Sequence, residues 1–238
     1  MRPAYPGAPA AFDKTMAALA LCALLLATIA APYDEAASRW ASASQISAVR
    51  LLAAYTDIGK SAAYLIASLG VALCATFINW RGRPVSSQAK VALIYSQALF
   101  AFSAISLSGI LVNLLKLLFA RARPRLLDAS GAYDFFSRWG TGYNFTSFPS
   151  GHSTTMGALA AVLCIWFPKA SFAILPACAL LAASRVAAGA HFPSDVIIGF
   201  SLGFLFSVYL ARVLARRRSA FRFYGRTFLP KPQYLAVI

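Results

Sequence analysis

Long runs of apolar residues constrain this chain more than any other feature of its sequence. Of the 238 residues, 60% are hydrophobic and only 12% are charged, and several runs approach the roughly 20 residues that cross a bilayer as a helix. Inside lipid, a helix satisfies its backbone hydrogen bonds within its own segment. The sequence lacks the alternating ten-residue segments of a membrane β-barrel. The runs therefore predict an all-α integral membrane protein.

Six of these runs divide the chain into a six-transmembrane-helix bundle and two tails. We expect an N-terminal tail over 1–15, the bundle over 16–214 and a basic C-terminal tail over 215–238. The first run could instead be a signal-peptide core, but we favour a retained helix because further membrane segments follow. The predicted spans are 16–31, 61–78, 91–118, 153–167, 171–183 and 193–214.

The segment 33–57 mixes charged and apolar residues after the first predicted span. Its apolar positions Ile46, Val49, Leu52 and Ala53 recur at helical spacing. This pattern predicts an amphipathic interfacial helix lying on the membrane surface. A connecting helix packed against the bundle would have the same pattern.

Positive charge exceeds negative charge by a wide margin, with 22 Lys and Arg against 7 Asp and Glu and a net charge of +15. Nucleic-acid binding can produce such a balance, but these cations lie in loops, at helix ends and in the tail. We therefore expect no nucleic-acid partner and assign the cations to membrane orientation and contact with anionic membrane lipids. With six spans, the side that carries both termini has more cations, so the positive-inside rule places it in the cytoplasm.

Three short polar stretches interrupt the apolar pattern, each at the end of a predicted span. In the first, Lys116 and Arg123 are seven residues apart, so they share one side of a helix if the helix continues. Pro124 ends the segment. An arginine fork and a lysine point charge together suit a doubly charged phosphate. Two interfacial cations without a ligand would have the same spacing.

The second stretch is Pro149, Ser150, Gly151 and His152, and it leads directly into the span 153–167. Free N–H groups at Ser150, Gly151 and the first helical turn could hold an anion, with help from the helix dipole. Gly151 permits close approach of the ligand, and His152 would stand beside it. A simple helix cap with an incidental histidine is the alternative interpretation.

The third stretch contains Arg185, His191 and Asp195 around the start of the last span. The spacing lets the Asp195 carboxylate hold one imidazole nitrogen of His191, which makes the other nitrogen a better nucleophile or base. An acid that merely favours a helix N-terminus would look the same. Ionisable groups at membrane depth are functional candidates by default, and both histidines of the chain lie in these stretches.

In this order and with these spacings, the three stretches resemble the signature of the type 2 phosphatidic acid phosphatase superfamily, also called lipid phosphate phosphatases. The resemblance covers residues 116–195, and the six-span organisation extends it over most of the chain. It implies that His191 attacks phosphorus, Asp195 orients His191 and His152 protonates the leaving oxygen. It also implies a set of phosphate-binding residues, which is Lys116, Arg123, Ser150, Gly151 and Arg185.

The resemblance implies a phosphoric monoester hydrolase that acts on a membrane lipid phosphate through a phospho-histidine. No cofactor is expected, and no second acid cluster could hold two divalent metals. Bacterial lipid A phosphatases and phosphatidylglycerophosphate phosphatases match the motifs about equally, and undecaprenyl pyrophosphate is a further candidate substrate. We expect a multi-pass protein of the bacterial inner membrane with both tails in the cytoplasm and the site facing the periplasm.

Two other classes of function remain at this point. A lipid phosphotransferase would use the same histidine and pass the phosphate to an acceptor lipid. A transporter or channel would predict paired broken helices or an inverted repeat, and the sequence contains neither. The sequence carries no indication of oligomeric state.

Overall fold

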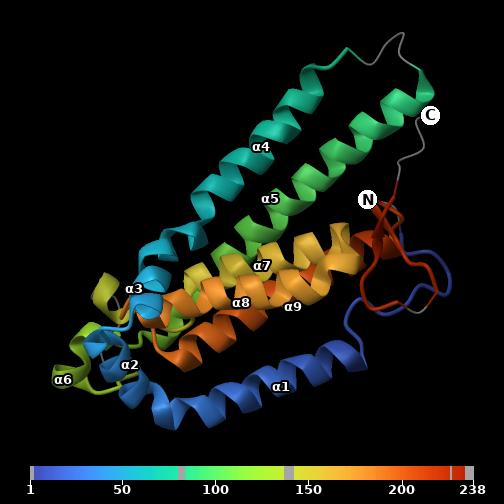
Figure 1. The fold of residues 1–238 in the computed structure, drawn as a ribbon. Coiled ribbons are helices and arrows are strands. Elements are labelled where there is room, and N and C mark those ends of the chain that lie inside the picture. Colours follow the sequence, from blue (N-terminus) through green and yellow to red (C-terminus); the bar gives the residue numbers. More distant parts are fainter. Residues whose placement is uncertain (1–2, 80–83, 137–141, 226, 234–238) are drawn as a thin grey trace.

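The computed structural model of the chain describes residues 3–79, 84–136, 142–225 and 227–233, and most of its regular structure is helical (Figure 1). Helices α7, α8 and α9 form the centre of the bundle, α1 runs along one flank, and α4 and α5 project away from it. The α-helices are α1 (Lys14–Ala30), α2 (Asp34–Ala43), α3 (Ser47–Ala54), α4 (Ser61–Phe77), α5 (Val85–Phe119), α6 (Leu127–Ser130), α7 (Gly151–Trp166), α8 (Ser171–Ala187) and α9 (Pro193–Arg216).

Short elements connect these helices and follow the last one. The 3-10 helices are η1 (Ala31–Tyr33), η2 (Tyr55–Gly59), η3 (Pro124–Leu126), η4 (Tyr143–Phe145) and η5 (Pro168–Ala170). Two strands of two residues, β1 (Phe221–Arg222) and β2 (Lys231–Pro232), pair antiparallel. The all-α prediction therefore holds for the bundle, and it missed this small strand pair in the C-terminal segment.

Five helical stretches of the described chain are long and apolar enough to cross a membrane, by length and composition: Lys14–Ala43, Ser47–Phe77, Val85–Ser130, Pro168–Ala187 and Pro193–Arg216. They contain four of the six predicted spans in full and a fifth, 61–78, except for its last residue. The remaining span, predicted at 153–167, is α7, which has 16 residues and so a length of about 24 Å. Most of its residues are buried by other helices. The six-span count stays a prediction.

Glycines allow α7 and α9 to pack closely at the centre of the bundle. A methyl group added at Gly203 would lie 2.0 Å from the Thr154 carbonyl oxygen, and one at Gly199 would lie 2.4 Å from that of Ser150. The two glycines are four residues apart, so they lie on one face of α9, as in the small-residue contacts of membrane helices. This contact sets the N-terminal ends of α7 and α9 side by side, where the second and third polar stretches begin.

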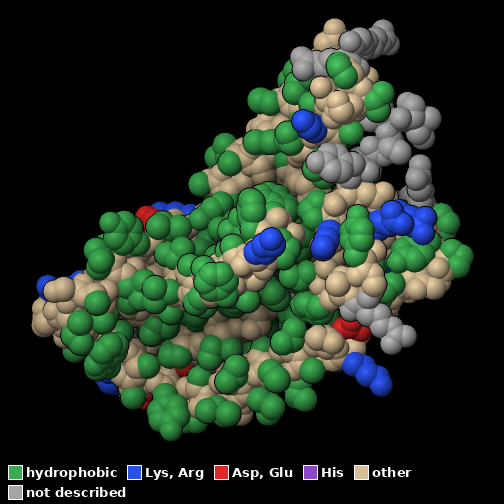
Figure 2. Space-filling model, turned by 45° about the vertical axis from the view of Figure 1, so that its right-hand side comes forward, with side chains coloured by type: hydrophobic (Ala, Val, Ile, Leu, Met, Phe, Trp, Pro, Cys, Tyr) green, Lys and Arg blue, Asp and Glu red, His purple; other side chains and the backbone are tan. Residues whose placement is uncertain are grey.

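Apolar side chains cover much of the outer surface (Figure 2). Exposed leucines, isoleucines and phenylalanines line α1, α4, α5 and α8, among them Leu21, Leu25, Ile66, Phe77, Ile110, Leu117 and Phe172. A soluble monomer rarely exposes apolar surface on this scale. The surface therefore fits a multi-pass membrane protein whose helix flanks face lipid.

The segment 33–57 forms two short helices and a 3-10 turn, rather than the single amphipathic helix predicted from its periodicity. Helix α2 ends before Ser44 and α3 begins after Ile46, because both of these residues have extended backbone, with ψ of 127° and 121°. Helix α3 and η2 lie against α8. The segment thus packs on the bundle, and its position relative to a membrane surface stays a prediction.

The helix that carries Lys116 does not continue to Arg123, so their shared helical face was the wrong reason to expect them together. Helix α5 ends at Phe119, and Ala120 turns the chain with a left-handed φ of 42°. Arg123 is extended, and its N–H donates to the carbonyl of Asn144 in the loop before α7. Loop structure rather than helical periodicity brings the two cations to one place.

The described residues before α1 and after α9 lie at the end of the bundle opposite the N-termini of α7 and α9 (Figure 1). The N–H of Tyr5 donates to the carbonyl of Arg216, and the Arg212 side chain donates to the carbonyls of Ala10 and Ala11. The described part of the predicted N-terminal tail is therefore packed against α9. Of the two predicted tails, residues 1–2, 226 and 234–238 lie outside the described residues.

Candidate active site

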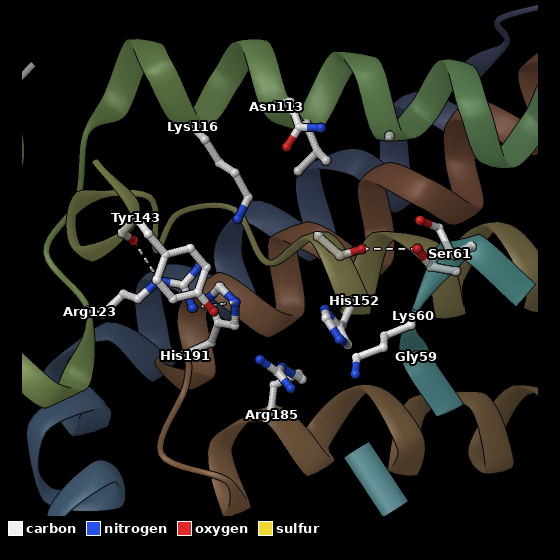
Figure 3. Close-up of a pocket in the computed structure, with 15 residues that line it drawn as sticks. Gly59, Lys60, Ser61, Asn113, Lys116, Arg123, Tyr143, His152, Arg185 and His191 are labelled. Atoms are coloured by element: carbon white, nitrogen blue, oxygen red, sulfur yellow. Dashed lines mark hydrogen bonds between the residues drawn. The ribbon is translucent and has the colours of Figure 1, made fainter. Parts of the chain in front are cut away.

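A cavity of about 380 Å³ opens where α4, α5, α7 and α8 meet the loop before α9 (Figure 3). Six of the eight predicted site residues line it, from all three polar stretches: Lys116, Arg123, Gly151, His152, Arg185 and His191. In Figure 3 the side chains of Lys116, His152, Arg185 and His191 point toward one shared space. Ser150 and Asp195 lie behind the cavity wall, both fully buried.

Among the described residues, the three predicted phosphate-binding cations make hydrogen bonds to neutral groups. Lys116 Nζ donates to the carbonyl of Thr146 at 2.9 Å, Arg123 Nε to that of Tyr143 at 2.9 Å, and Arg185 Nη1 to the Thr56 hydroxyl at 2.9 Å. No ion pair joins any of the three to a carboxylate within the described chain. Buried cations without a counter-charge are costly, so this cavity is suited to an anion.

Arg123 contacts the predicted nucleophile. Its Nη1 lies 3.5 Å from His191 Nε2 and donates to the Ala190 carbonyl at 3.2 Å. The guanidinium stacks 3.8 Å from the centre of the Tyr143 ring, and such stacking holds the planar fork in one orientation. An oxygen bound by this fork would lie beside His191 Nε2.

The two imidazole nitrogens of His191 face different groups. On the side away from Arg123, Nδ1 lies 3.6 Å from Asp195 Oδ2 and 3.5 Å from the Ser147 hydroxyl oxygen. Ser147 donates to Asp195 Oδ2 at 2.5 Å, and the Phe192 N–H donates to the same oxygen at 3.0 Å. The Nδ1–Oδ2 distance exceeds an ordinary hydrogen bond, and catalytic hydrogen bonds often tighten only when substrate is bound. This arrangement favours a proton on Nδ1 and a free lone pair on Nε2.

His191 is held in the turn between α8 and α9, where the Arg185 carbonyl accepts its backbone N–H at 3.3 Å. Burial lowers the pKa of His191 to about 3, although the neighbouring Asp195 carboxylate acts in the opposite direction. The imidazole is therefore neutral near pH 7. A neutral imidazole is the form that can act as a nucleophile.

His152 stands on the other side of the cavity, at the start of α7. Its Nε2 is buried and has no hydrogen-bond partner among the described residues, and the same is true of Arg185 Nε. Buried polar atoms are normally paired, so these two atoms mark places where a ligand oxygen could bind. A methyl group added at Gly59 would lie 3.1 Å from His152 Cβ, which shows how closely η2 packs on this histidine.

Ser150 and Gly151 differ in what they offer to a ligand. The Ser150 hydroxyl caps α7 by accepting from the Ser153 N–H at 3.4 Å, and the Ser150 N–H donates to the Asp195 carbonyl at 3.1 Å. The free N–H expected at Ser150 is therefore already used. Gly151 lines the cavity, and a methyl group there would contact Lys116 Cε at 3.8 Å.

Several groups near the site were not predicted from the sequence. Ser147 lies between His191 and Asp195. Lys60 lines the cavity from the start of α4. Arg121 and Asp34 form a buried ion network with Asp195. In the sequence, Arg121 is one of several cations outside the predicted spans, and Asp34 is one charged residue of the segment 33–57. Both charges flank a predicted span end, which is the one signal that could have singled them out.

The chain is similar to known proteins of one family. A family model described as the PAP2 superfamily matches residues 97–219. A lipid A 1-phosphatase of Rhizobium johnstonii is 37% identical over 168 residues, covering 68% of this chain and 66% of that protein. A lipid A 1-phosphatase of Rhizobium etli is 43% identical over 117 residues, covering 49% of this chain and 50% of that protein. The chain thus spans about half to two thirds of the curated relatives it matches.

A solved structure resembles the fold. It is the crystal structure of a transmembrane PAP2 type phosphatidylglycerolphosphate phosphatase from Bacillus subtilis, with a TM-score of 0.56 and 24% sequence identity. The match covers 83% of this chain and 94% of the other. At this level of identity the likeness concerns the arrangement of the helices.

Proposed function

The chain belongs to the PAP2 superfamily, and from that premise we propose that it is a membrane lipid phosphatase that hydrolyses a phosphate monoester through a phospho-histidine. One observation carries the proposal: Lys116, Arg123 and Arg185 line a cavity with both histidines and have no carboxylate partner in the described chain. A phosphate dianion supplies the missing negative charge. The same cations would stabilise the charge on the equatorial oxygens in the transition state.

In the first step, His191 Nε2 attacks phosphorus and the bond between phosphorus and the lipid oxygen breaks. The Nε2 lone pair becomes the P–N bond, and the imidazole keeps its Nδ1 proton beside Asp195. Burial and the nearby Arg185 lower the pKa of His152 to about 4, and a bound phosphate dianion acts in the opposite direction and favours the protonated ring. This imidazolium, across the cavity, gives its proton to the leaving oxygen and becomes neutral. Splitting hydrolysis into two steps in this way is the usual advantage of covalent catalysis.

In the second step, water attacks the phosphorus of the phospho-histidine from the side that the lipid alcohol has left. His152 takes one proton from that water as a general base, the P–N bond breaks, and inorganic phosphate leaves. Both histidines then return to their starting protonation states. Asp195 holds the His191 ring in place throughout.

For the substrate we propose a phosphate monoester of lipid A, because two relatives carry the name lipid A 1-phosphatase. The first alternative is phosphatidylglycerophosphate, which the structural neighbour's title names. Undecaprenyl pyrophosphate is the second alternative. A lipid phosphotransferase would share the first step and replace water by an acceptor lipid in the second.

The decisive experiment uses the purified full chain in detergent with lipid A that carries labelled phosphate. We expect labelled inorganic phosphate to be released in excess chelator, with inhibition by vanadate, which mimics five-coordinate phosphorus. Restoration of activity only after a divalent ion is added would overturn the metal-independent mechanism. Label that moves to a second lipid would favour the phosphotransferase, and release only from phosphatidylglycerophosphate or the pyrophosphate would change the substrate.

We also propose that the cavity faces the periplasm of a bacterial inner membrane, with six spans and both termini in the cytoplasm. The test replaces all four cysteines by alanine and adds a single cysteine. Ala129→Cys in α6, near the site, should react with a membrane-impermeant thiol reagent in intact spheroplasts. Ser219→Cys, after α9, should react only after lysis. The reverse pattern would invert the topology. Thr141, another position for a cysteine in the loop before α7, lies outside the described residues.

A further inference from the structure

Arg121 is almost fully buried behind the cavity wall, with its side chain 2% exposed. Its Nη1 donates to Asp195 Oδ1 at 2.5 Å and to the Ser194 hydroxyl at 2.8 Å. Its Nη2 donates to Asp34 Oδ2 at 2.7 Å and to the Ala132 carbonyl at 2.7 Å, and its Nε lies 3.1 Å from the same carbonyl. Arginine is the side chain that can bridge two carboxylates with separate nitrogens of one rigid plane.

Asp34 completes this network from a distant part of the chain. It is the first residue of α2, it is fully buried, and it accepts the Ser194 N–H at 3.0 Å and the Ser194 hydroxyl proton. Asp34 therefore holds the first turn of α9 as well as Arg121. A buried carboxylate is tolerated only when it is paired and hydrogen-bonded, and here both conditions are met.

The two oxygens of Asp195 are divided between this network and the nucleophile. Oδ1 faces Arg121, while Oδ2 faces Ser147, the Phe192 N–H and His191 Nδ1. Rotation of the carboxylate by less than a half turn would move one oxygen away from Arg121 and the other away from His191. The network thus fixes the plane of the carboxylate and keeps one oxygen facing the imidazole, although none of Arg121, Asp34 and Asp195 lines the cavity.

We propose that Arg121 and Asp34 are positioning residues for the His191–Asp195 pair. This inference rests on the proposed function. Arg121 fixes the Asp195 carboxylate so that Oδ2 meets His191 Nδ1, and Asp34 fixes Arg121 and the α9 N-terminus. Together Asp34, Arg121 and Asp195 carry one net negative charge, which balances the positive charge that the imidazole gains when Nε2 bonds to phosphorus.

A purely structural salt bridge makes a different prediction, and Arg212 provides the matched control. It is also a buried arginine, 2% exposed, bonded to Asp13 and to backbone carbonyls at the opposite end of α9. Arg121→Met and Arg212→Met should both lower the melting temperature in detergent. Only Arg121→Met should also reduce kcat of the folded enzyme, by about 10- to 100-fold, as when the outer partner of a functional histidine is removed.

The kinetic pattern should identify the affected step. We expect the loss in kcat on both a lipid phosphate monoester and nitrophenyl phosphate, with little change in KM, because the two substrates share the nucleophile. Single-turnover labelling should show slower formation of the phospho-enzyme. Arg121→Lys keeps the charge but loses the planar fork that holds the two carboxylates on separate nitrogens, so it should resemble Arg121→Met. Wild-type kcat in folded Arg121→Lys and Arg121→Met would overturn the proposal.

A double variant guards against misfolding of Arg121→Met, which leaves two unpaired buried carboxylates. Asp34→Asn combined with Arg121→Met restores the net charge of minus one. We expect it to melt closer to wild type than Arg121→Met and still to have low kcat, because nothing fixes Asp195 Oδ1. Recovery of wild-type kcat in the double variant would reduce Arg121 to a charge-compensating structural residue.

A spectroscopic readout separates this inference from the proposed function. In a His152→Asn background, His191 is the only histidine, so its ring nitrogens give one set of NMR signals in isotope-labelled protein. We expect a proton on Nδ1 in the parent and a mixture of tautomers when Arg121→Met is added. Unchanged signals would overturn the positioning role even if the chain hydrolysed no lipid phosphate. Lack of hydrolysis with the expected tautomer shift would overturn only the proposed function.

Discussion

The two ends of α9 both bury arginine, yet they treat positive charge differently. At the C-terminal end, Arg212 is satisfied by Asp13 and by backbone carbonyls. At the N-terminal end, Arg121 is satisfied in the same way by Asp34 and Asp195. The two ends are about 25 Å apart, since 17 residues separate Asp195 from Arg212 along one helix.

The difference lies in the cations that surround these arginines. Beside the N-terminal end of α9, Lys116, Arg123 and Arg185 contact neutral oxygens and face an open cavity. Desolvating a charge without a partner is unfavourable by several kcal/mol. A chain retains such groups where a ligand supplies the counter-charge, whereas a paired arginine needs no ligand. The comparison therefore separates cations that hold the fold from cations that are available to substrate.

The largest effect should come from the nucleophile. His191→Ala removes the atom that bonds to phosphorus, so we expect turnover to fall by more than about 10³-fold on every substrate, as for a lost nucleophile. Asp195→Asn should be a weaker form of the same lesion, because it misorients the ring without removing it. Phosphate release from a lipid monoester and from nitrophenyl phosphate measures both. If nitrophenyl phosphate rescues His191→Ala, the roles assigned to the two histidines are exchanged.

His152→Ala should strongly reduce turnover of the lipid monoester and affect nitrophenyl phosphate much less. The lipid alcohol is a strongly basic leaving group and needs a proton, while nitrophenolate leaves without one. We expect a loss of about 10²-fold or more on the lipid monoester, a typical contribution of a general acid, and a much smaller loss on nitrophenyl phosphate. Each variant must retain the parent melting temperature in detergent. Equal losses on both substrates would contradict the role of a general acid.

Lysine substitutions compare the arginines near the two ends of α9 directly. Arg123→Lys keeps the charge but removes the fork geometry, and we expect at least about a 10-fold loss of turnover, as for one lost preorganised donor. Arg212→Lys makes the same chemical change at the other end, and it should lower the melting temperature without changing turnover. Wild-type turnover in Arg123→Lys would mean that Arg123 is only an interfacial anchor.

A smaller effect on turnover is expected from a substitution at Gly59. This glycine packs on His152, and no glycine among the described residues makes an equivalent contact near the C-terminal end of α9. The added Cβ of Gly59→Ala would lie 3.1 Å from His152 Cβ and 3.2 Å from its Cδ2, closer than ordinary contact. The imidazole must shift, so turnover of the lipid monoester should fall less than in His152→Ala. Nitrophenyl phosphate should report almost no change. A loss shared equally by the two substrates would indicate a general packing defect instead.

The smallest expected effect is that His191 does not titrate between pH 8 and pH 5. Because burial lowers the pKa of His191 to about 3, the ring stays neutral from pH 8 to pH 5 and gains a proton only in strong acid. In the His152→Asn background, the His191 ring signals should therefore be constant over that range by NMR. A midpoint near 6.5, the ordinary value for histidine, would show that the site is far wetter than its burial indicates.

Some parts of the site could be predicted from the sequence for the correct physical reason. For others the predicted residues do meet, but the predicted local structure was wrong. The histidines and the cations stood out because ionisable groups are rare inside apolar runs, and the cavity does bring six of the predicted residues together. Lys116 and Arg123 meet, but through a turn at Ala120 instead of a continuing helix. Ser150 was expected to offer a free N–H, which the Asp195 carbonyl accepts.

The sequence also contains a local pattern for helix packing. Gly199 and Gly203 lie four residues apart in the last span, a spacing that allows membrane helices to approach closely. The structure places Thr154 of α7 and the N-cap residue Ser150 against them. That contact joins the second polar stretch to the third, which the order of the spans alone did not require.

The sequence by itself determined the membrane character, the positions of most helices and the chemistry available at the three polar stretches, because these depend on residue type and on spacing over a few turns. Only the tertiary structure decided that Asp34 and Asp195, 161 residues apart, share Arg121, and that Gly59 packs on His152. Partners of buried charges depend on which helix ends meet in space. That meeting is set by the packing of the whole bundle, and no local pattern encodes it.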